Sequence, residues 1–127
     1  MRARHVIKEN ERVLKCAESL RLGNLDHVGE LINASHISLR DDFEVSSEAL
    51  DLMVDCALAA PGCYGARMTG AGFGGCAVAL VESKYTEKFV NKVINSYQTS
   101  TGKKALLYVC KASEGTSVFS NDEFAAN

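Results

Sequence analysis

The residues best placed to do chemistry form a dense cluster of glycines near the middle of the chain. Four of the seven residues from position 70 to position 76 are glycine, whereas the whole chain has only ten. Glycine lets a backbone turn tightly and expose its N–H groups. Successive exposed N–H groups form a concave nest that suits an anion, often a phosphate. The segment 65–76 (GARMTGAGFGGC) therefore predicts contact with a phosphorylated ligand.

Two well-known phosphate loops can be compared with this segment. Gly70, Gly72 and Gly75 have the spacing G-x-G-x-x-G, which indicates dinucleotide binding only between a strand and a helix. Here the glycines precede a short aliphatic run, 76–81 (CAVALV), that is typical of a buried strand, so the loop joins strand to strand. The P-loop interpretation also fails, because no Lys-Ser or Lys-Thr pair follows the glycines. A tight hairpin whose glycines serve only the turn is the structural alternative.

Two long motifs carry a resemblance to a known family. The segment 65–76 resembles the third conserved motif of the GHMP small-molecule kinases, in its galactokinase form. The block 35–46 (SHISLRDDFEVS) resembles the Ser-His-x-Ser-Leu-x-Asp-Asp-Tyr/Phe-x-Val-Ser stretch of galactokinases, and its spacing to the glycine motif also fits. The segment 2–6 (RARHV) resembles a stretch slightly upstream. The resemblance covers about residues 2 to 112.

The resemblance implies the fold and chemistry of the C-terminal domain of a GHMP kinase. That domain is α+β, with a ferredoxin-like antiparallel sheet and helices. In the whole enzyme, ATP and Mg²⁺ support phosphoryl transfer to the C1 hydroxyl of galactose, and the glycine loop borders the phosphate. Phe73 would either exclude water there or occupy the hairpin tip. The residues expected beside the phosphate or nucleotide are Thr69, Gly70, Ala71, Gly72, Phe73, Gly74 and Gly75.

The family's sugar-binding signature, its Pro-x-Gly-x-Gly-Leu-Ser-Ser-type nucleotide loop and its catalytic aspartate match no segment of this sequence. The one proline, Pro61, is followed by Gly62-Cys63 and cannot belong to that nucleotide loop. We therefore expect a single C-terminal domain over residues 1–127, with a polar and partly mobile tail at about 113–127. We expect no catalytic residue, no bound cofactor and no activity from this chain alone. Its expected partner is an N-terminal kinase domain, without which the chain exposes apolar surface and self-associates.

Six further residues are candidates for interface or secondary contacts: Ser35, His36, Arg40, Asp41, Asp42 and Arg67. His36 either makes such a contact or is an ordinary hydrogen-bonded helix residue. Arg67 either faces a phosphate or is an ordinary charge on a strand. The adjacent Asp41 and Asp42 could be taken for paired catalytic carboxylates, but beside Arg40 they are more typical of a turn with an ion pair.

The composition indicates a single globular domain and argues against several other classes of protein. A chain of 127 residues with 46% hydrophobic and 24% charged residues is typical of one globular domain. The net charge of −2 and the lack of a Lys/Arg cluster argue against nucleic acid. No apolar run or signal-like N-terminus indicates a membrane or export, so we expect a cytoplasmic protein. Five widely spaced cysteines without a C-x-x-C pair indicate buried thiols in a reducing compartment, and they indicate no metal site.

The elements that must position the loop follow from the hydrophobic pattern. A first helix at 3–21 places Val6, Ile7, Val13, Leu14, Ala17 and Leu20 on one face. Asn24 and Ser46 are predicted caps of a second and a third helix. Strands are expected at 64–69, 75–81 and 105–110, with a turn at 40–43 and a fourth helix at 84–99 that ends by Gly102. This order resembles most of a ferredoxin-like split unit.

Three functions are compatible with these observations. The first is the C-terminal domain of a galactokinase-like sugar kinase. The second is a non-catalytic regulatory or sensor protein that keeps the same fold to bind sugar and nucleotide. The third is another GHMP kinase, which acts on a different small alcohol. The residues that would distinguish them lie in the N-terminal segments that this sequence does not match.

Overall fold

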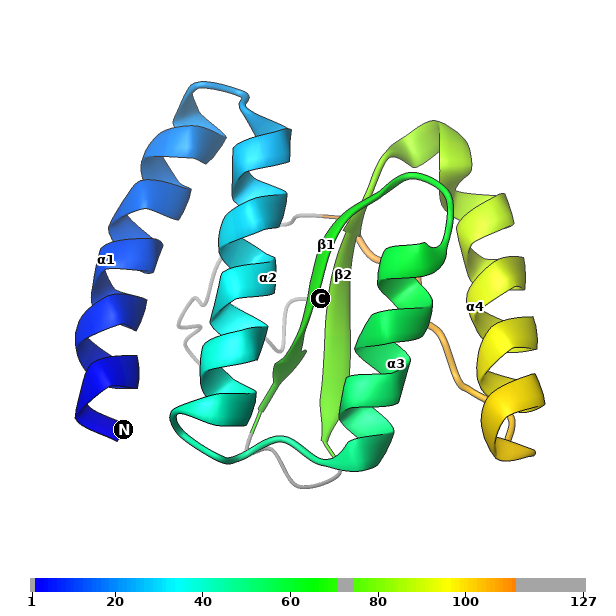
Figure 1. Cartoon of the computed structure of the whole chain (residues 1–127). Coiled ribbons are helices and arrows are strands. Elements are labelled where there is room, and N and C mark those ends of the chain that lie inside the picture. Colours follow the sequence, from blue (N-terminus) through cyan, green and yellow to red (C-terminus); the bar gives the residue numbers. More distant parts are fainter. Residues whose placement is uncertain (1, 71–74, 112–127) are drawn as a thin grey trace, which may run out of the picture.

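The structure, a computed structural model, describes residues 2–70 and 75–111. Two antiparallel helices, α1 (Arg2–Arg21) and α2 (Leu25–Asp41), come first in the chain. They are followed by α3 (Glu48–Ala59) and by the hairpin of β1 (Cys63–Thr69) and β2 (Cys76–Val81). A short 3₁₀ turn (Ser83–Tyr85) leads into α4 (Thr86–Thr101). The hairpin lies between the α1–α2 pair on one side and α3 and α4 on the other (Figure 1).

The core lies between the hairpin and the helices α3 and α4. The two strands are antiparallel, with Ala66 opposite Ala79 and Thr69 opposite Cys76. Alternate strand residues therefore face α3, where small side chains let the helix approach closely. The buried residues of this core are Val54, Cys56, Ala57 and Ala60 around α3, Ala66 on β1, and Phe89 and Val93 on α4. The α+β class and the antiparallel sheet predicted from the sequence are confirmed.

Most helix ends agree with the predicted signals. The Asn24 side chain accepts a hydrogen bond from the backbone of His27, and Gly102 ends α4 with a left-handed φ of 72°. The predicted cap Ser46 is wrong by one residue. Ser47 accepts from the Leu50 N–H, because the Ser46 hydroxyl is engaged with Asp51. The helix α2 also runs further than predicted and ends only at Asp41.

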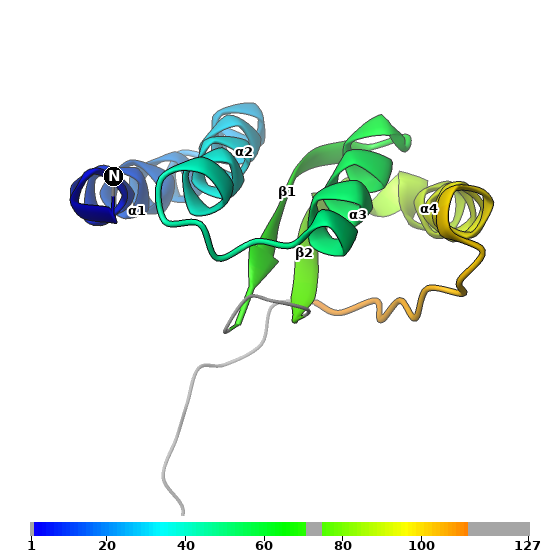
Figure 2. The ribbon, with the colours of Figure 1, turned by 60° about the horizontal axis from the view of Figure 1, so that its bottom comes forward.

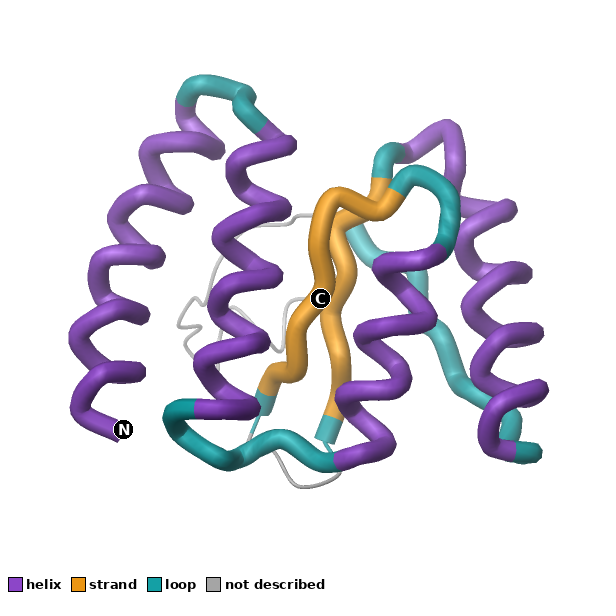
Figure 3. The backbone as a smooth tube through the Cα atoms, in the orientation of Figure 1, coloured by secondary structure: helices purple, strands orange, loops and turns teal. Residues whose placement is uncertain are grey.

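The third strand predicted at 105–110 is wrong for the described residues. The described sheet has two strands, and residues 103–111 form a loop (Figure 3). Ala105 is buried and Leu107 packs against the core, but the other apolar side chains of the segment point to solvent, with Tyr108 83% exposed. The segment is therefore held by side chains without the hydrogen-bond ladder that defines a strand.

The prediction that the cysteines are buried thiols holds for only one of them. Cys56 is buried, Cys16 and Cys63 are half-buried, and Cys76 and Cys110 are exposed; all five are free. Burial raises the pKa of the Cys56 and Cys63 thiols. Cys76 is exposed because it begins β2 at the loop end of the hairpin, opposite Thr69. Cys110 is exposed because it lies in the segment that forms no strand.

Within the described residues, no helix is both long and apolar enough to cross a membrane. The same residues contain no group of three or more histidines, cysteines and carboxylates that could hold a metal ion. The predicted polar tail at about 113–127 lies outside the described residues and stays a prediction.

The helix α1 turns its predicted apolar face to solvent, in line with the expectation that the chain exposes apolar surface. Its apolar residues Val6, Ile7, Val13, Leu14 and Leu20 are exposed, and its two buried residues are polar, His5 and Ser19. The face toward α2 instead carries residues 5, 9, 12, 16 and 19, which repeat at intervals of four and three as in a helix–helix seam. Hydrogen bonds join His5 to Ser38 and Ser19 to His27 across this seam.

The helix α2 lies directly against the outer edge of β1 (Figure 2). The two backbones touch at a pair of glycines, Gly29 on the helix and Gly65 on the strand. A Cβ on Gly29 would overlap the carbonyl oxygen of Tyr64, and a Cβ on Gly65 would meet the Gly29 carbonyl. These two positions need glycine because a side chain at either would push the helix off the strand.

This contact predicts the effect of Gly29→Ala. Helix propensity alone would stabilise the chain by about 1 kcal/mol. The overlap with a backbone atom should reverse this sign and destabilise the fold by about 1–3 kcal/mol. Urea or thermal unfolding of the purified chain measures the effect, and Glu30→Ala, at the exposed neighbouring position of the same helix, is the control. A stabilised Gly29→Ala variant would contradict the close approach.

Candidate functional site

The glycine loop connects the two strands of the hairpin, as the sequence predicted. Thr69 and Cys76 form the last pair of the ladder, and Gly70 leaves it with a φ of +81°. This left-handed conformation is the one that glycine adopts without strain. Gly75 precedes β2. The predicted phosphate contacts Ala71, Gly72, Phe73 and Gly74 lie outside the described residues.

A cavity of about 410 Å³ lies at the root of this loop. Its walls come from three parts of the chain that are distant in sequence: the start of α1, the connection from α2 to α3, and the end of β1. The lining residues are His5 and Glu9, then Leu39, Phe43 and Val45, and then Arg67, Met68, Thr69 and Gly70. Three candidates, Arg67, Thr69 and Gly70, therefore line one cavity together with residues that were not among the candidates.

His36 is a central residue of the site and its side chain is only 5% exposed. Its Nδ1 accepts the backbone N–H of Met68 at 3.0 Å. Because Nδ1 is an acceptor, the ring proton is on Nε2, which donates to Asp51 at 2.9 Å. The Ser46 hydroxyl donates to the same carboxylate oxygen at 2.7 Å. His36 thus ties α3 to β1 two residues before the glycine loop begins.

Asn33 makes a matching contact one helical turn earlier. Its Oδ1 accepts the backbone N–H of Ala66 at 3.0 Å. Since Ala66 and Met68 are alternate residues of β1, their N–H groups both point away from β2. Two side chains of α2 therefore satisfy the donors on the free edge of the strand. Sequence reasoning missed Asn33 and Asp51, whose only signal was a polar side chain close to an apolar stripe, and it gave Ser46 only the role of a helix cap.

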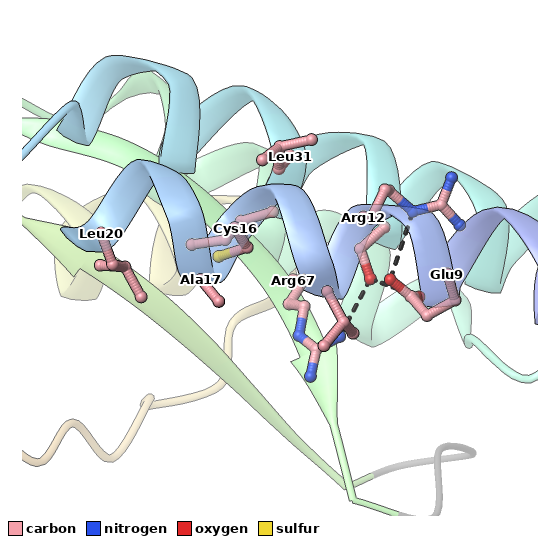
Figure 4. Close-up of a pocket in the computed structure, with 10 residues that line it drawn as sticks. Glu9, Arg12, Cys16, Ala17, Leu20, Leu31 and Arg67 are labelled. Carbon is pink, nitrogen blue, oxygen red and sulfur yellow. Dashed lines mark hydrogen bonds and ion pairs between the residues drawn. The ribbon is translucent and has the colours of Figure 1, made fainter. Parts of the chain in front are cut away.

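Ser35 and Arg67 meet in a polar cluster between α1, α2 and β1. Arg67 donates from Nη1 to the Ser35 hydroxyl at 2.9 Å, and Ser35 donates to Glu9 Oε2 at 2.7 Å. Arg12 donates from Nε to the other Glu9 oxygen at 3.2 Å. Figure 4 shows Glu9, Arg12 and Arg67 converging at one end of a second hollow. Glu9 and Arg12 could have been found in the sequence from their place in the four-and-three repeat that faces α2. The more obvious apolar stripe of α1 obscured this repeat.

The remaining candidates lie away from this cluster. Arg40 and Asp41 pair with each other at 2.7 Å at the exposed end of α2, which confirms the ion-pair interpretation. The hydrogen bonds from Arg40 lower the pKa of the Asp41 carboxyl. Asp42 instead accepts from the Ser38 hydroxyl at 3.2 Å and lies 3.7 Å from Arg4. Asp41 and Asp42 thus have separate partners and do not act as a pair. Interface roles for the six candidates stay predictions.

The sequence comparisons agree with this geometry. The family model for the C-terminal part of the GHMP kinases matches residues 16–98, more than half of the chain. The chain belongs to the GHMP kinase family. It is 51% identical over 122 residues to a galactokinase of Chloroflexus aurantiacus, an alignment covering 95% of this chain and 31% of that protein. A galactokinase of Exiguobacterium sibiricum is 49% identical over 90% of this chain and 29% of its own length.

Two solved structures resemble this GHMP kinase chain. The crystal structure of Lactococcus lactis galactokinase complexed with galactose superposes with a TM-score of 0.76 at 45% identity, over 80% of this chain and 26% of that one. The structure of L. major mevalonate kinase in complex with R-mevalonate gives a TM-score of 0.61 at 29% identity, over 72% and 26%. The chain thus spans less than a third of the length of these relatives.

The two hydrogen bonds of His36 can be separated with two variants. His36→Asn keeps an acceptor near the Nδ1 position and loses the reach to Asp51. His36→Gln keeps a donor near the Nε2 position and leaves the Met68 N–H without its acceptor. An unmade bond to a buried donor costs about 1–3 kcal/mol, so amide exchange at Met68 should speed up about 10- to 100-fold in His36→Gln. It should stay slow in His36→Asn.

Hydrogen exchange followed by NMR on the purified chain measures this difference. The Ala66 amide, held by Asn33, is the internal control and should change little in either variant. Equal exchange at Met68 in the two variants would show that His36 does not hold the strand through Nδ1.

Proposed function

We propose that this chain is the C-terminal domain of a galactokinase-type sugar kinase, which transfers a phosphoryl group from ATP to the C1 hydroxyl of galactose. The observation that carries the proposal is a glycine-rich turn between two strands, with Gly70 in the left-handed region, in a chain about 50% identical to galactokinases. In this role the backbone from Thr69 to Gly75 would border the transferred phosphate.

The described residues can account for the positioning of the glycine loop in phosphoryl transfer. Phosphoryl transfer depends mainly on positioning and on charge stabilisation, which a rigidly anchored loop of backbone N–H groups can supply. The Met68–His36 bond and the Ala66–Asn33 bond anchor the strand that leads into the loop. A Mg²⁺ ion that accompanies the nucleotide would then need carboxylates from elsewhere, because the described residues contain no metal-binding cluster.

The comparisons favour a sugar substrate over another small alcohol. Identity to the galactokinases is 45–51%, whereas identity to the mevalonate kinase is 29%. Since those galactokinases are much longer, we propose that an N-terminal kinase region completes the site. The exposed apolar residues Val6, Ile7, Val13 and Leu14 of α1 suit a partner of this kind. A cytoplasmic location and self-association of the isolated chain stay predictions.

The first functional prediction concerns activity. The chain alone should give no galactose-dependent ATP turnover, because the family's nucleotide loop and catalytic aspartate match no segment of this sequence. A chimera should be active in which this chain replaces the GHMP C-terminal region of the Chloroflexus aurantiacus galactokinase. A coupled assay with ATP, Mg²⁺ and galactose measures both proteins. Turnover that copurifies with the chain alone, or a folded but inactive chimera, would contradict the proposal.

A second prediction concerns the residue at which the glycine loop begins. It compares two glycines at which a side chain would cause similar backbone strain. Gly70 and Gly102 both have positive φ, and a Cβ at either would meet no atom of the described residues within 4 Å. Alanine should therefore cost about 1–2 kcal/mol of stability at each position. Only Gly70→Ala adds a methyl group next to the proposed phosphate, so only this variant should lower turnover of the chimera, by about tenfold or more. Equal losses of turnover in the two variants would show that the loop entry has only a structural role.

A further inference from the structure

A groove of about 380 Å³ runs between α1, α2 and β1, and it shares Glu9 and Arg67 with the cavity at the loop root. Its walls are apolar, with Val13, Ala17 and Leu20 from α1 and Leu31 from α2 (Figure 4). Val13 is 60% and Leu20 54% exposed, so the groove is open to solvent. An apolar groove of this kind is a binding surface for side chains that would otherwise face water.

One end of the groove is polar and carries more guanidinium than carboxylate. Arg12 and Arg67 both line this end, and Glu9 is the single carboxylate there. Glu9 is already shared: it accepts from Arg12 and from Ser35, and the His5 ring lies 3.6 Å from its Oε2. Among the described residues, the hydrogen-bond partner of Arg67 is a neutral hydroxyl, that of Ser35. The end of the groove therefore has an excess of positive charge.

A buried donor marks the same place. The Nη2 of Arg12 is shielded from solvent and has no hydrogen-bond partner within the described part of the chain. Leaving a charged donor unpaired costs more than leaving a neutral one, so native structures rarely do so. A guanidinium binds a carboxylate with two parallel hydrogen bonds, which neither a hydroxyl nor a carbonyl can reproduce. A carboxylate therefore matches the guanidinium groups at this end of the groove better than a neutral group does.

We propose that this groove docks a polypeptide segment in which an acidic residue lies beside apolar ones. The carboxylate would occupy the end between Arg12 and Arg67, and the apolar neighbours would cover Val13, Leu20 and Leu31. We assign the segment to the N-terminal region of the kinase, which rests on the proposed function, because the relatives extend far beyond the part matched by this chain. The surplus charge and the apolar walls together favour such a segment over a purely apolar one.

The chemistry of the groove can be tested on the chain alone, independently of any kinase activity. The probe is octanoate, which combines a carboxylate with an aliphatic chain, and NMR titration measures its binding. Octanoate should shift the signals of Leu31, Ser35 and Arg67. Octanol and octylammonium should bind about tenfold more weakly or worse, since they lack the charge that pairs with the guanidinium groups. Equal binding of octanoate and octylammonium would overturn the proposal.

Three variants test whether octanoate binding depends on the positive charge at the end of the groove. Arg67→Gln should weaken octanoate binding about tenfold, because it removes one guanidinium. Glu9→Gln should strengthen binding, because it removes the competing carboxylate and leaves the cationic groups in place. Arg21→Gln, on the exposed side of the same helix and paired with Glu18, is the matched control and should change nothing. If Arg67→Gln fails to fold, the opposite sign expected for Glu9→Gln still decides the outcome.

The chimera with the Chloroflexus aurantiacus N-terminal region tests the source of the carboxylate. If a polypeptide segment fills the groove, the folded chimera should no longer bind octanoate, whether or not it phosphorylates galactose. A chimera that binds octanoate as well as the chain alone would overturn the docking of a segment and leave a site for a free carboxylate. An inactive chimera with a closed groove would instead count against the proposed function only.

Discussion

The contact on which the rest of the structure depends is that of α2 with the outer edge of β1. An edge strand presents a row of unpaired backbone N–H and C=O groups, and one way to protect them is to cover the edge with a helix. Here a helix does so, because Gly29 and Gly65 let the two backbones touch and Asn33 and His36 then reach the N–H groups of the strand. The three helix positions 29, 33 and 36 lie on one face. The strand that carries the glycine loop is therefore fixed between β2 and a helix.

This arrangement explains why so many buried groups near the loop are polar. A helix that replaces a strand must supply side-chain acceptors, and each acceptor must itself be oriented. His36 is oriented by Asp51, and Asp51 also accepts from Ser46 at the start of α3. On the other side of α2, Ser35 and Ser38 join it to Glu9 and His5 of α1. Displacing one helix would leave several buried polar groups unpaired, so the network favours one relative position of three helices and a strand.

Local signals were sufficient for much of the fold, but not for this network. The cap at Asn24, the left-handed Gly102 and the strand–loop–strand order are properties of short segments, and the sequence alone predicted them. The polar seam of α1 was not predictable, because a periodic apolar stripe normally marks the buried face and here it marks the exposed one. The prediction of a strand at 105–110 was wrong for a related reason. An apolar run shows that a segment can form a strand, but forming one also needs the edge of another strand at the right distance.

The exposed stripe of α1 and the polar seam beneath it both fit the proposed packing of this chain against an N-terminal region. A domain that packs against another must keep apolar surface for that partner, and its own helices must then be held by contacts that do not compete for this surface. Hydrogen bonds between His5 and Ser38 and between Ser19 and His27 fulfil this requirement, because they fix α1 on α2 and leave its apolar side chains free. Where the seam meets Arg67, the donors outnumber the acceptors, and Arg12 Nη2 has none within the described residues. The hydrogen-bond network between α1, α2 and β1 is thus incomplete at one place. At that same place β1, the strand that leads into the glycine loop, borders the open groove.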